Sequence, residues 1–196
     1  MALDWDGTAT ERDTLALLLA ELGDPRVYED CERRLLAGEI SYRRLLEAEM
    51  ATIRVPVVDA ARWLLDRVRV RAGLRELAAV ADVTVLSSGF HELIEPLLAR
   101  EAIELPVVAN RVEDTPDGWR VVWRDDAPCP ECGDYCKRRG LPPPPFVYVG
   151  DGYSDRCPAP SAERVFARDG LARYLDEQGV AYEPFDDLRD VVRALT

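Results

Sequence analysis

The chain has 196 residues and a formal net charge of −12, from 25 Lys and Arg against 37 Asp and Glu. This length suits one domain or one core with an insertion, and no apolar run approaches the ~18 residues of a membrane span. The acidic surplus argues against a nucleic-acid partner, because such binders carry a basic footprint. Charge near the N-terminus, where a signal peptide is apolar, predicts a cytoplasmic protein with no membrane partner.

The first part of the chain is predicted to be a short strand followed by helices. Residues 2–6 are typical of a strand end, and Gly7 and Thr8 then turn the chain. Helix-forming residues recur at helical spacing from about 13 to 70 and predict an all-helical block. The helices expected there are 13–22, 26–54 and 57–70.

From residue 72 onward, helices and strands are predicted to alternate. Apolar, β-branched runs bounded by turn residues indicate buried strands of a parallel sheet. These strands are expected at 83–86, 105–109, 146–149 and 164–167, with helices at 74–81, 91–100, 171–177 and 188–195. A Thr-Pro-Asp-Gly turn predicts a hairpin between 111–113 and 119–123. The expected fold class is α/β, a Rossmann-like parallel sheet flanked by helices.

Polar residues follow three of the expected strands. Ligands of an open parallel sheet bind beyond the carboxyl ends of its strands. The residues found there are Asp4, Asp6, Gly7, Thr8, Ser87, Ser88, Gly89, Gly150, Asp151 and Asp155. Clustered carboxylates need a cation between them, and oxygen ligands suit Mg²⁺. Hydroxyls and backbone N–H groups at a turn suit a phosphate.

The basic residues comprise 24 Arg and a single Lys, Lys137. A lone Lys in an Arg-rich chain indicates a place where a guanidinium does not substitute for an ammonium. The alternative is an ordinary surface Lys on a loop. Lys137 shortly precedes the 146–149 strand, so we expect it at the same edge of the sheet. The only His is His91, which nearly excludes multi-His metal sites and His-based triads.

Four motifs, in order along the chain, resemble those of the haloacid dehalogenase superfamily. They are Asp4-Trp5-Asp6-Gly7-Thr8, Ser87 within Val85–Phe90, Lys137, and Gly150-Asp151-Gly152-Tyr153-Ser154-Asp155. The helical insertion is similar to the small cap of the phosphoserine-phosphatase-like branch. This resemblance implies a core of residues 1–12 and 71–196, with a cap at 13–70.

Two groups within that branch share further sequence runs with this chain. Residues 132–137 and 165–185 resemble the 2,3-diketo-5-methylthio-1-phosphopentane phosphatases of methionine salvage. Residues 148–158 resemble the phosphoethanolamine/phosphocholine phosphatases. Neither similarity fixes a substrate.

The resemblance implies a Mg²⁺-dependent phosphomonoester hydrolase acting on a small phosphorylated metabolite. Asp4 would form an aspartyl-phosphate, and Asp6 would act as acid and then base. Lys137 and Ser87 would bind the phosphoryl oxygens, together with Thr8, Ser88 and Gly89. Asp4, Asp6 through its carbonyl, Asp151 and Asp155 would hold the metal. Cap residues that face the substrate or, alternatively, only solvent are Glu11, Asp13, Arg43 and Arg44.

A cysteine cluster supports a second interpretation. Cys129-x₂-Cys132-x₃-Cys136 is half of a zinc pattern, and Cys157 is a possible fourth ligand. Reduced thiols or a disulfide are the alternatives. The competing function is a non-catalytic metal-binding regulatory or interaction protein with a zinc-stapled Cys loop. The oligomeric state is left open between monomer and homodimer.

Overall fold

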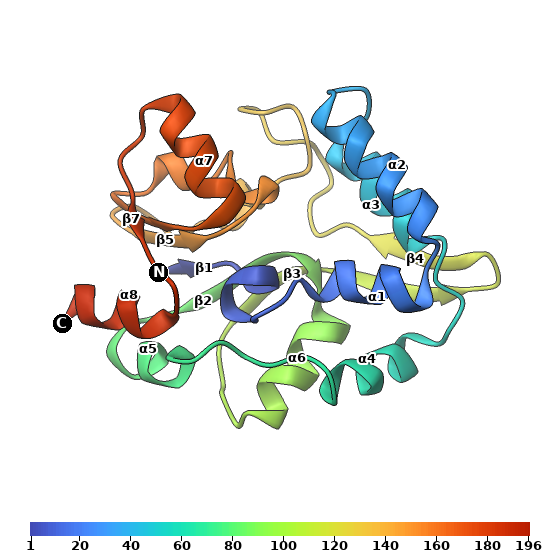
Figure 1. The fold of residues 1–196 in the computed structure, drawn as a ribbon, viewed down its shortest axis with the longest axis horizontal. Helices are drawn as coiled ribbons and strands as arrows, with labels where there is room; N and C mark the ends of the chain where they lie inside the picture. Colours follow the sequence, from blue (N-terminus) through green and yellow to red (C-terminus); the bar gives the residue numbers. More distant parts are fainter.

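A computed structural model describes all 196 residues as a seven-stranded sheet in the order β4-β3-β2-β1-β5-β6-β7 (Figure 1). Its strands are β1 (Ala2–Leu3), β2 (Thr84–Phe90), β3 (Val107–Thr115), β4 (Gly118–Val122), β5 (Val147–Gly150), β6 (Arg164–Ala167) and β7 (Glu183–Pro184). All neighbouring strands are parallel except β3 and β4, which form an antiparallel hairpin. The α/β class predicted from the sequence is confirmed.

Helices cover both faces of the sheet. They are α5 (Leu74–Val80), α6 (His91–Arg100), α7 (Asp169–Gln178) and α8 (Leu188–Leu195). Figure 1 shows α5, α6 and α8 on one side of the strands and α7 on the other. Because successive strand residues point to opposite faces, Leu3 joins the core with α6 while Ala2 joins the core with α7. This two-faced burial explains the nearly continuous apolar runs of the parallel strands.

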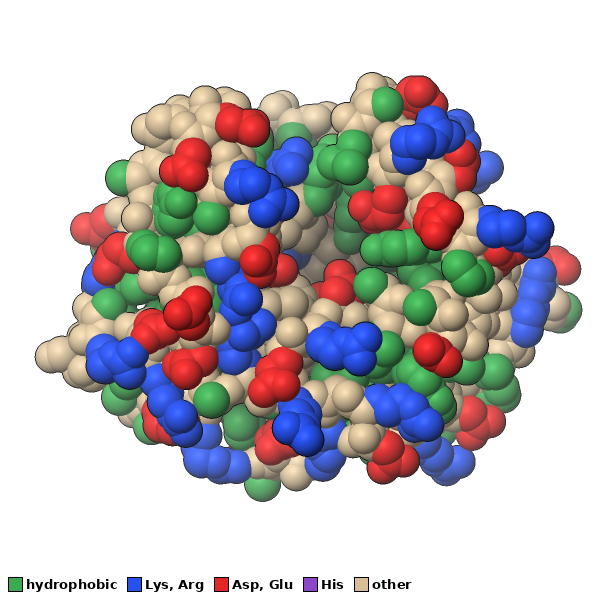
Figure 2. All heavy atoms as spheres, viewed as in Figure 1, with side chains coloured by type: hydrophobic (Ala, Val, Ile, Leu, Met, Phe, Trp, Pro, Cys, Tyr) green, Lys and Arg blue, Asp and Glu red, His purple; other side chains and the backbone are tan.

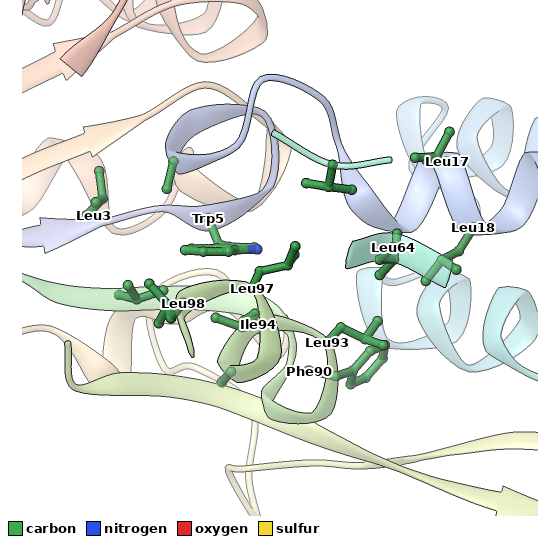
Figure 3. Close-up of a cluster of buried hydrophobic side chains, with 14 of the residues drawn as sticks. Leu3, Trp5, Leu17, Leu18, Leu64, Phe90, Leu93, Ile94, Leu97 and Leu98 are labelled. Atoms are coloured by element: carbon green, nitrogen blue, oxygen red, sulfur yellow. The ribbon is translucent and has the colours of Figure 1, made fainter. Parts of the chain in front are cut away.

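The larger core packs directly beneath the start of the chain. Trp5 is fully buried and lies against the apolar face of α6 beside Ile94 and Leu97 (Figure 3). Leu3 joins the same cluster from β1. The residues on either side of Asp4 are therefore fixed by apolar packing, which positions a polar side chain between them.

Four helices precede α5 in the segment between β1 and β2. They are α1 (Thr14–Leu22), α2 (Pro25–Leu36), α3 (Tyr42–Met50) and α4 (Val57–Leu65). The single helix expected over 26–54 is wrong, because the chain forms two helices, α2 and α3, there. Gly38 takes a positive φ of 71° after α2, and Ser41 caps α3 by accepting from the Arg44 amide. The reversal lets α2 and α3 pack together (Figure 1).

The strands also differ from their predicted bounds. The first strand ends at Leu3 rather than near Asp6, because an irregular helical turn begins at Trp5. β2 continues through the Ser87-Ser88-Gly89 turn signal and ends at Phe90. The expected strand 105–109 and hairpin arm 111–113 are one strand, β3, which pairs with β2 and then with β4. Because β2 pairs with the first part of β3 and β4 pairs with the second, the chain stays extended where the local sequence predicted a break.

None of the helices combines the length and the apolar character that crossing a membrane requires.

Candidate active site

Asp4 lies at the carboxyl end of β1, in the middle of the sheet. Its amide donates to the Val149 carbonyl of β5 at 2.9 Å, so two packed strands fix its backbone. The residue is only 4% exposed. Thr8, on the helical turn that follows, places its hydroxyl 3.1 Å from Asp4 Oδ2 and 2.8 Å from Asp151 Oδ1. The hydroxyl therefore links the end of β1 to the end of β5.

Lys137 is buried between two carboxylates. Its ammonium donates to Asp4 Oδ1 and, at 2.6 Å, to Asp155 Oδ1, and the residue is 1% exposed. Burial opposes the charge, but the Asp155 and Asp4 carboxylates outweigh it and raise the pKa of Lys137. Lys137 is therefore a fixed cation at the sheet edge, and the alternative of a solvated surface Lys is wrong.

Asp155 is held by several donors at once. Besides Lys137, its Oδ1 accepts from the Tyr148 hydroxyl at 2.7 Å. Its Oδ2 accepts from the amides of Asp151 and Gly152 at 3.0 and 2.9 Å. Asp155 thus fixes the turn that follows β5 and, through Lys137, the side chain of Asp4.

Carboxylate oxygens of Asp4, Asp151 and Asp155 lie within 4.8 Å of one another. Burial and the nearby Asp155 charge raise the pKa of Asp4 to about 6. Burial and the Asp4 charge raise the pKa of Asp151 to about 9. Such crowding of buried acids is relieved by a hard divalent cation, and an all-oxygen donor set with an open side suits Mg²⁺. The residues present therefore fit that ion.

Asp6 points away from this group, towards the cap. Its Oδ1 accepts from the Thr14 amide at 3.0 Å and contacts the Thr14 hydroxyl, at the start of α1. Its Oδ2 lies 3.0 Å from where a Cβ on Gly89 would stand. Burial and the Asp13 charge raise the pKa of Asp6 to about 7. A carboxyl that titrates near neutrality suits acid–base chemistry.

The carboxyl end of β2 supplies hydroxyls and amides opposite Asp6. Ser87 and Ser88 are both buried, and the Ser87 hydroxyl accepts from the Gly89 amide at 2.9 Å. Asn110 of β3 donates to the Ser88 carbonyl at 2.9 Å and holds this end of β2 in place. Asn110 and Thr14 support the site, but no motif in the sequence indicated either of them.

These side chains meet at one pocket of about 200 Å³, between the strand ends and helices α1, α2 and α3. Figure 2 shows this hollow in the middle of the viewed face, with acidic side chains on its rim. The strand-end residues that line it are Asp4, Asp6, Ser87, Ser88, Gly89 and Asp151. Lys137, Thr8 and Asp155 lie behind these groups and do not line it.

Only one of the cap residues considered from sequence, Asp13, lines the pocket. Glu11 and Arg44 are exposed. Arg43 pairs with Glu47 at 2.8 Å and stacks 4.6 Å from the Tyr135 ring. The cap instead presents residues that sequence reasoning missed, namely Tyr28, Glu32, Tyr42 and Glu49. The signal was available, because Tyr42, Leu45, Leu46 and Glu49 share one face of α3 at helical spacing.

The four cysteines of the 129–157 region form a second cluster. Their sulfur atoms lie within 4.8 Å of one another, and Cys129 and Cys157 are 4.0 Å apart. All five cysteines of the chain are free thiols, so the alternative of a disulfide is not seen. Cys136 directly precedes Lys137, and Cys157 lies two residues beyond Asp155. The cluster therefore joins two segments that hold the active site.

Comparison with known proteins agrees with this arrangement. A 2-hydroxy-3-keto-5-methylthiopentenyl-1-phosphate phosphatase of Exiguobacterium sibiricum is 26% identical, over 96% of this chain and 92% of the relative. The polyol phosphate phosphatase PYP1 of Saccharomyces cerevisiae is 28% identical, over 98% and 90%. A phosphoserine phosphatase solved as a phospho-aspartyl intermediate analogue has a TM-score of 0.72 at 15% identity, covering 100% of this chain and 97% of that one. The last match shows the same fold.

The fold and the strand-end carboxylates define an α/β protein whose candidate reacting groups lie at the carboxyl edge of a mostly parallel sheet. A family model described as haloacid dehalogenase-like hydrolase matches residues 1–159. The chain belongs to this family, and the resemblance inferred from the four motifs is confirmed.

Proposed function

We propose that this protein hydrolyses a small phosphomonoester in a Mg²⁺-dependent reaction through an aspartyl-phosphate. Family membership and the phosphatase relatives support this function over the non-catalytic alternative considered from the sequence. The observation that carries the proposal is the buried contact of Lys137 with Asp4, at the wall of a pocket that Asp6 also lines. A carboxylate held ionised by a fixed ammonium is a competent nucleophile.

The two carboxyl groups would act in sequence. An Asp4 oxygen attacks phosphorus, and the bond from phosphorus to the leaving oxygen breaks as Asp6 donates its proton to that oxygen. The ionised Asp6 then takes a proton from water, which attacks the aspartyl-phosphate and releases inorganic phosphate with Asp4 restored. Asp6 suits both steps because Thr14 holds only its Oδ1 and its pKa is raised to about 7.

The remaining residues would bind and orient the phosphoryl group. Ser87, Ser88 and Gly89 line the pocket, and their hydroxyls and amides would bind phosphoryl oxygens there. Lys137 holds the Asp4 carboxylate ionised and, with Thr8, fixes its direction. Both are positioning residues, because neither lines the pocket in this structure.

Asp4, Asp151 and the carbonyl of Asp6 are proposed to hold Mg²⁺, with Asp155 beside them. When bound, the ion would offset negative charge on the phosphoryl oxygens and between the carboxylates. Asp155 would act mainly through the backbone turn and Lys137, because its oxygens already accept four hydrogen bonds.

Residues 13–70 are proposed to act as a cap over a core made of residues 1–12 and 71–196. Helices α1, α2 and α3 supply the side of the pocket that faces the strand ends. Tyr42 of α3 stacks on Tyr153 of the core, with ring centroids 6.2 Å apart. A cap in this place would exclude water from the aspartyl-phosphate until the alcohol has left.

The substitution Asp4→Asn tests the nucleophile. The amide keeps the size of the side chain but cannot attack phosphorus, so phosphate release from an aryl phosphate with Mg²⁺ should fall at least 1000-fold. Asp126→Asn is the matched control, because Asp126 is exposed between β4 and Cys129 and its substitution should leave turnover unchanged. Turnover of Asp4→Asn within tenfold of the unsubstituted enzyme would exclude Asp4 as the nucleophile.

We also propose that Cys129, Cys132, Cys136 and Cys157 bind a structural zinc ion. Four thiolates around zinc lie ~3.8 Å from one another, and the observed cluster is close to that spacing. The ion would fasten the Lys137 loop to the segment after β5. Metal analysis of protein purified without chelator should find one zinc per chain, lost in Cys132→Ser and kept in Cys31→Ser. Absence of zinc, with no rise in Tm when zinc is added, would contradict the site.

A further inference from the structure

The turn that follows β1 carries two side chains of the site in different directions. Asp6 points towards the start of α1, whereas the hydroxyl of Thr8 lies 2.8 Å from Asp151 Oδ1. Gly7, between them, has a φ of 75°. Because a glycine restricts its own backbone less than any other residue, this turn is only as rigid as the contacts that hold it. The direction of Asp6 therefore depends on what fixes the main chain at Gly7.

The half-buried Arg71 binds the carbonyls of this turn. Its Nε donates to the Thr8 carbonyl at 2.8 Å, and its Nη2 donates to the Gly7 carbonyl, also at 2.8 Å. The same Nη2 donates to the Thr10 carbonyl at 3.1 Å. Hydrogen bonds from a charged donor are stronger than those between neutral groups. One guanidinium thus restrains three successive parts of the main chain around Gly7.

Arg71 is itself fixed by its neighbours. Its amide donates to the Ala9 carbonyl at 2.8 Å, and the adjacent Val70 pairs with Thr10 in an antiparallel bridge. Its Nη1 donates to the Asp186 carbonyl at 3.0 Å, just before α8. The chain that enters helices α1 to α4 and the chain that leaves them therefore run side by side here. The guanidinium reaches from the second of these connections to the turn.

The two reacting carboxylates differ in how much they need this restraint. The amide of Asp4 donates to the Val149 carbonyl of β5, and its carboxylate contacts the buried Lys137. Asp6 lies beyond the end of β1, and the donors to its carboxylate both belong to Thr14. A looser turn would therefore displace Asp6 while strand pairing and Lys137 keep Asp4 in place.

We propose that Arg71 is a positioning residue for the acid step, holding Asp6 at the leaving oxygen through the carbonyls of Gly7 and Thr8. This inference rests on the phosphatase function proposed above and adds a residue to it. Arg71 does not line the pocket, so it acts through Asp6 rather than on the substrate. A Lys would not replace it, because a single nitrogen cannot occupy the separate positions from which Nε and Nη2 donate.

Phenyl phosphate and 4-nitrophenyl phosphate separate the acid step from the other steps. Phenolate is the stronger base and gains more from a proton as its bond to phosphorus breaks, whereas 4-nitrophenolate leaves readily without one. Because kcat/KM covers the reaction only up to departure of the phenol, the later use of Asp6 as a base does not enter. We expect Arg71→Ala to lower kcat/KM about 50-fold for phenyl phosphate and less than about fivefold for 4-nitrophenyl phosphate. Equal losses for the two esters would overturn the proposal.

Arg75→Ala is the matched control. Arg75 of α5 is exposed and also donates to main-chain carbonyls, those of Glu101 and Ala102, but neither of these lines the pocket. This substitution should leave kcat/KM for both esters unchanged. Arg71→Lys keeps the charge and part of the contacts, and it should show the same preferential loss for phenyl phosphate, about tenfold. It provides the test if Arg71→Ala does not fold, which a thermal unfolding measurement would show.

A double-mutant cycle with Asp6→Asn tests whether Arg71 acts through Asp6. In a chain that already carries Asp6→Asn, the further change Arg71→Ala should lower kcat/KM for phenyl phosphate less than about threefold. Losses that multiply in the double variant would overturn the proposal, because they would mean that the two residues act independently. If neither ester is hydrolysed in an Asp4-dependent manner by the unsubstituted enzyme, the phosphatase function itself fails and the role of Arg71 fails with it.

Discussion

At the scale of single residues, the site depends on Lys137, a buried cation whose surroundings leave no space for a larger side chain. Lys137 is 1% exposed and reaches Asp4 and Asp155 with one small ammonium. A guanidinium is larger, planar and donates along fixed directions. Retention of Lys here, in a chain whose other 24 cations are Arg, has a steric reason as well as an electrostatic one.

The substitution Lys137→Arg should therefore fail despite keeping the charge. We expect kcat for an aryl phosphate to fall about 100-fold, because the larger group displaces Asp4 or Asp155, and Tm to fall by several degrees. The reverse exchange Arg139→Lys, at an exposed neighbouring position, should leave both unchanged. Activity of Lys137→Arg within threefold of the unsubstituted enzyme would show that only charge matters at this position.

Glu49 should reveal its burial through the pH dependence of stability. Its pKa is about 8 when folded against an ordinary 4.5, so the folded state holds its proton more tightly than the unfolded state. The Glu49 contribution to the free energy of unfolding therefore falls as pH rises from about 4.5 to about 8. As pH rises across this window, the free energy of unfolding of Glu49→Gln should therefore increase relative to that of the unsubstituted protein, by on the order of 2 kcal/mol.

Urea unfolding of both proteins at pH 5 and pH 8.5 measures that difference. If the free energies of unfolding of the two proteins differ by the same amount at both pH values, Glu49 ionises as it does in water.

The site motifs and Lys137 could be predicted from sequence because their residue types are exceptional in their context. The spacing of α3 places Glu49 on the same face as Leu45 and Leu46, but one helix alone does not tell whether that face meets a cavity or solvent.

At the scale of elements, the turn after β1 decides how the carboxylates meet. Gly7 has a φ of 75°, and a Cβ there would stand 2.3 Å from Asp151 Oδ2. The chain can thus bring β1 and β5 together only where residue 7 has no side chain. Sequence indicated a turn at Gly7, but the close approach to Asp151 depends on β1 and β5, which are 144 residues apart along the chain (147 − 3).

The substitution Gly7→Ala combines strain with a clash and should be severe. We expect a loss of about 3 kcal/mol in the free energy of unfolding and at least a 100-fold loss in kcat, because Asp151 must move. Gly38→Ala is the control, since its φ of 71° is similar but open space surrounds it. A loss at Gly38 as large as that at Gly7 would leave backbone strain as the whole effect.

The same scale shows why some predicted bounds are wrong. Residues 26–54 have helix formers throughout, yet the chain breaks at Gly38 because α2 must fold back on α3 to bury Leu35 and Leu45. Conversely, β3 runs through Asn110 without a break because two different partners pair with its two halves. Tertiary packing overrides local propensity in both places.

At the scale of the whole molecule, the pocket exists only while the helices of 13–70 stay seated on the sheet. Asp134, on the loop between Cys132 and Cys136, caps α3, its carboxylate accepting from the Tyr42 amide at 2.5 Å and from the Arg43 amide at 3.3 Å. Three residues further along the same loop lies Lys137. One loop therefore fixes both the nucleophile and the helix that carries Glu49.

Loss of the Asp134 contacts with α3 should loosen the pocket while leaving the reacting side chains of the core in place. In Asp134→Ala the first amides of α3 lose their acceptor, a change worth about 1 kcal/mol, so the closed arrangement becomes less populated. We expect KM to rise five- to tenfold for the substrate with the most cap contacts, and less than twofold for a small aryl phosphate. Asp134→Asn, which keeps an acceptor oxygen, should recover most of the difference. Equal effects on kcat for both substrates would instead place the damage at Lys137, through the shared loop.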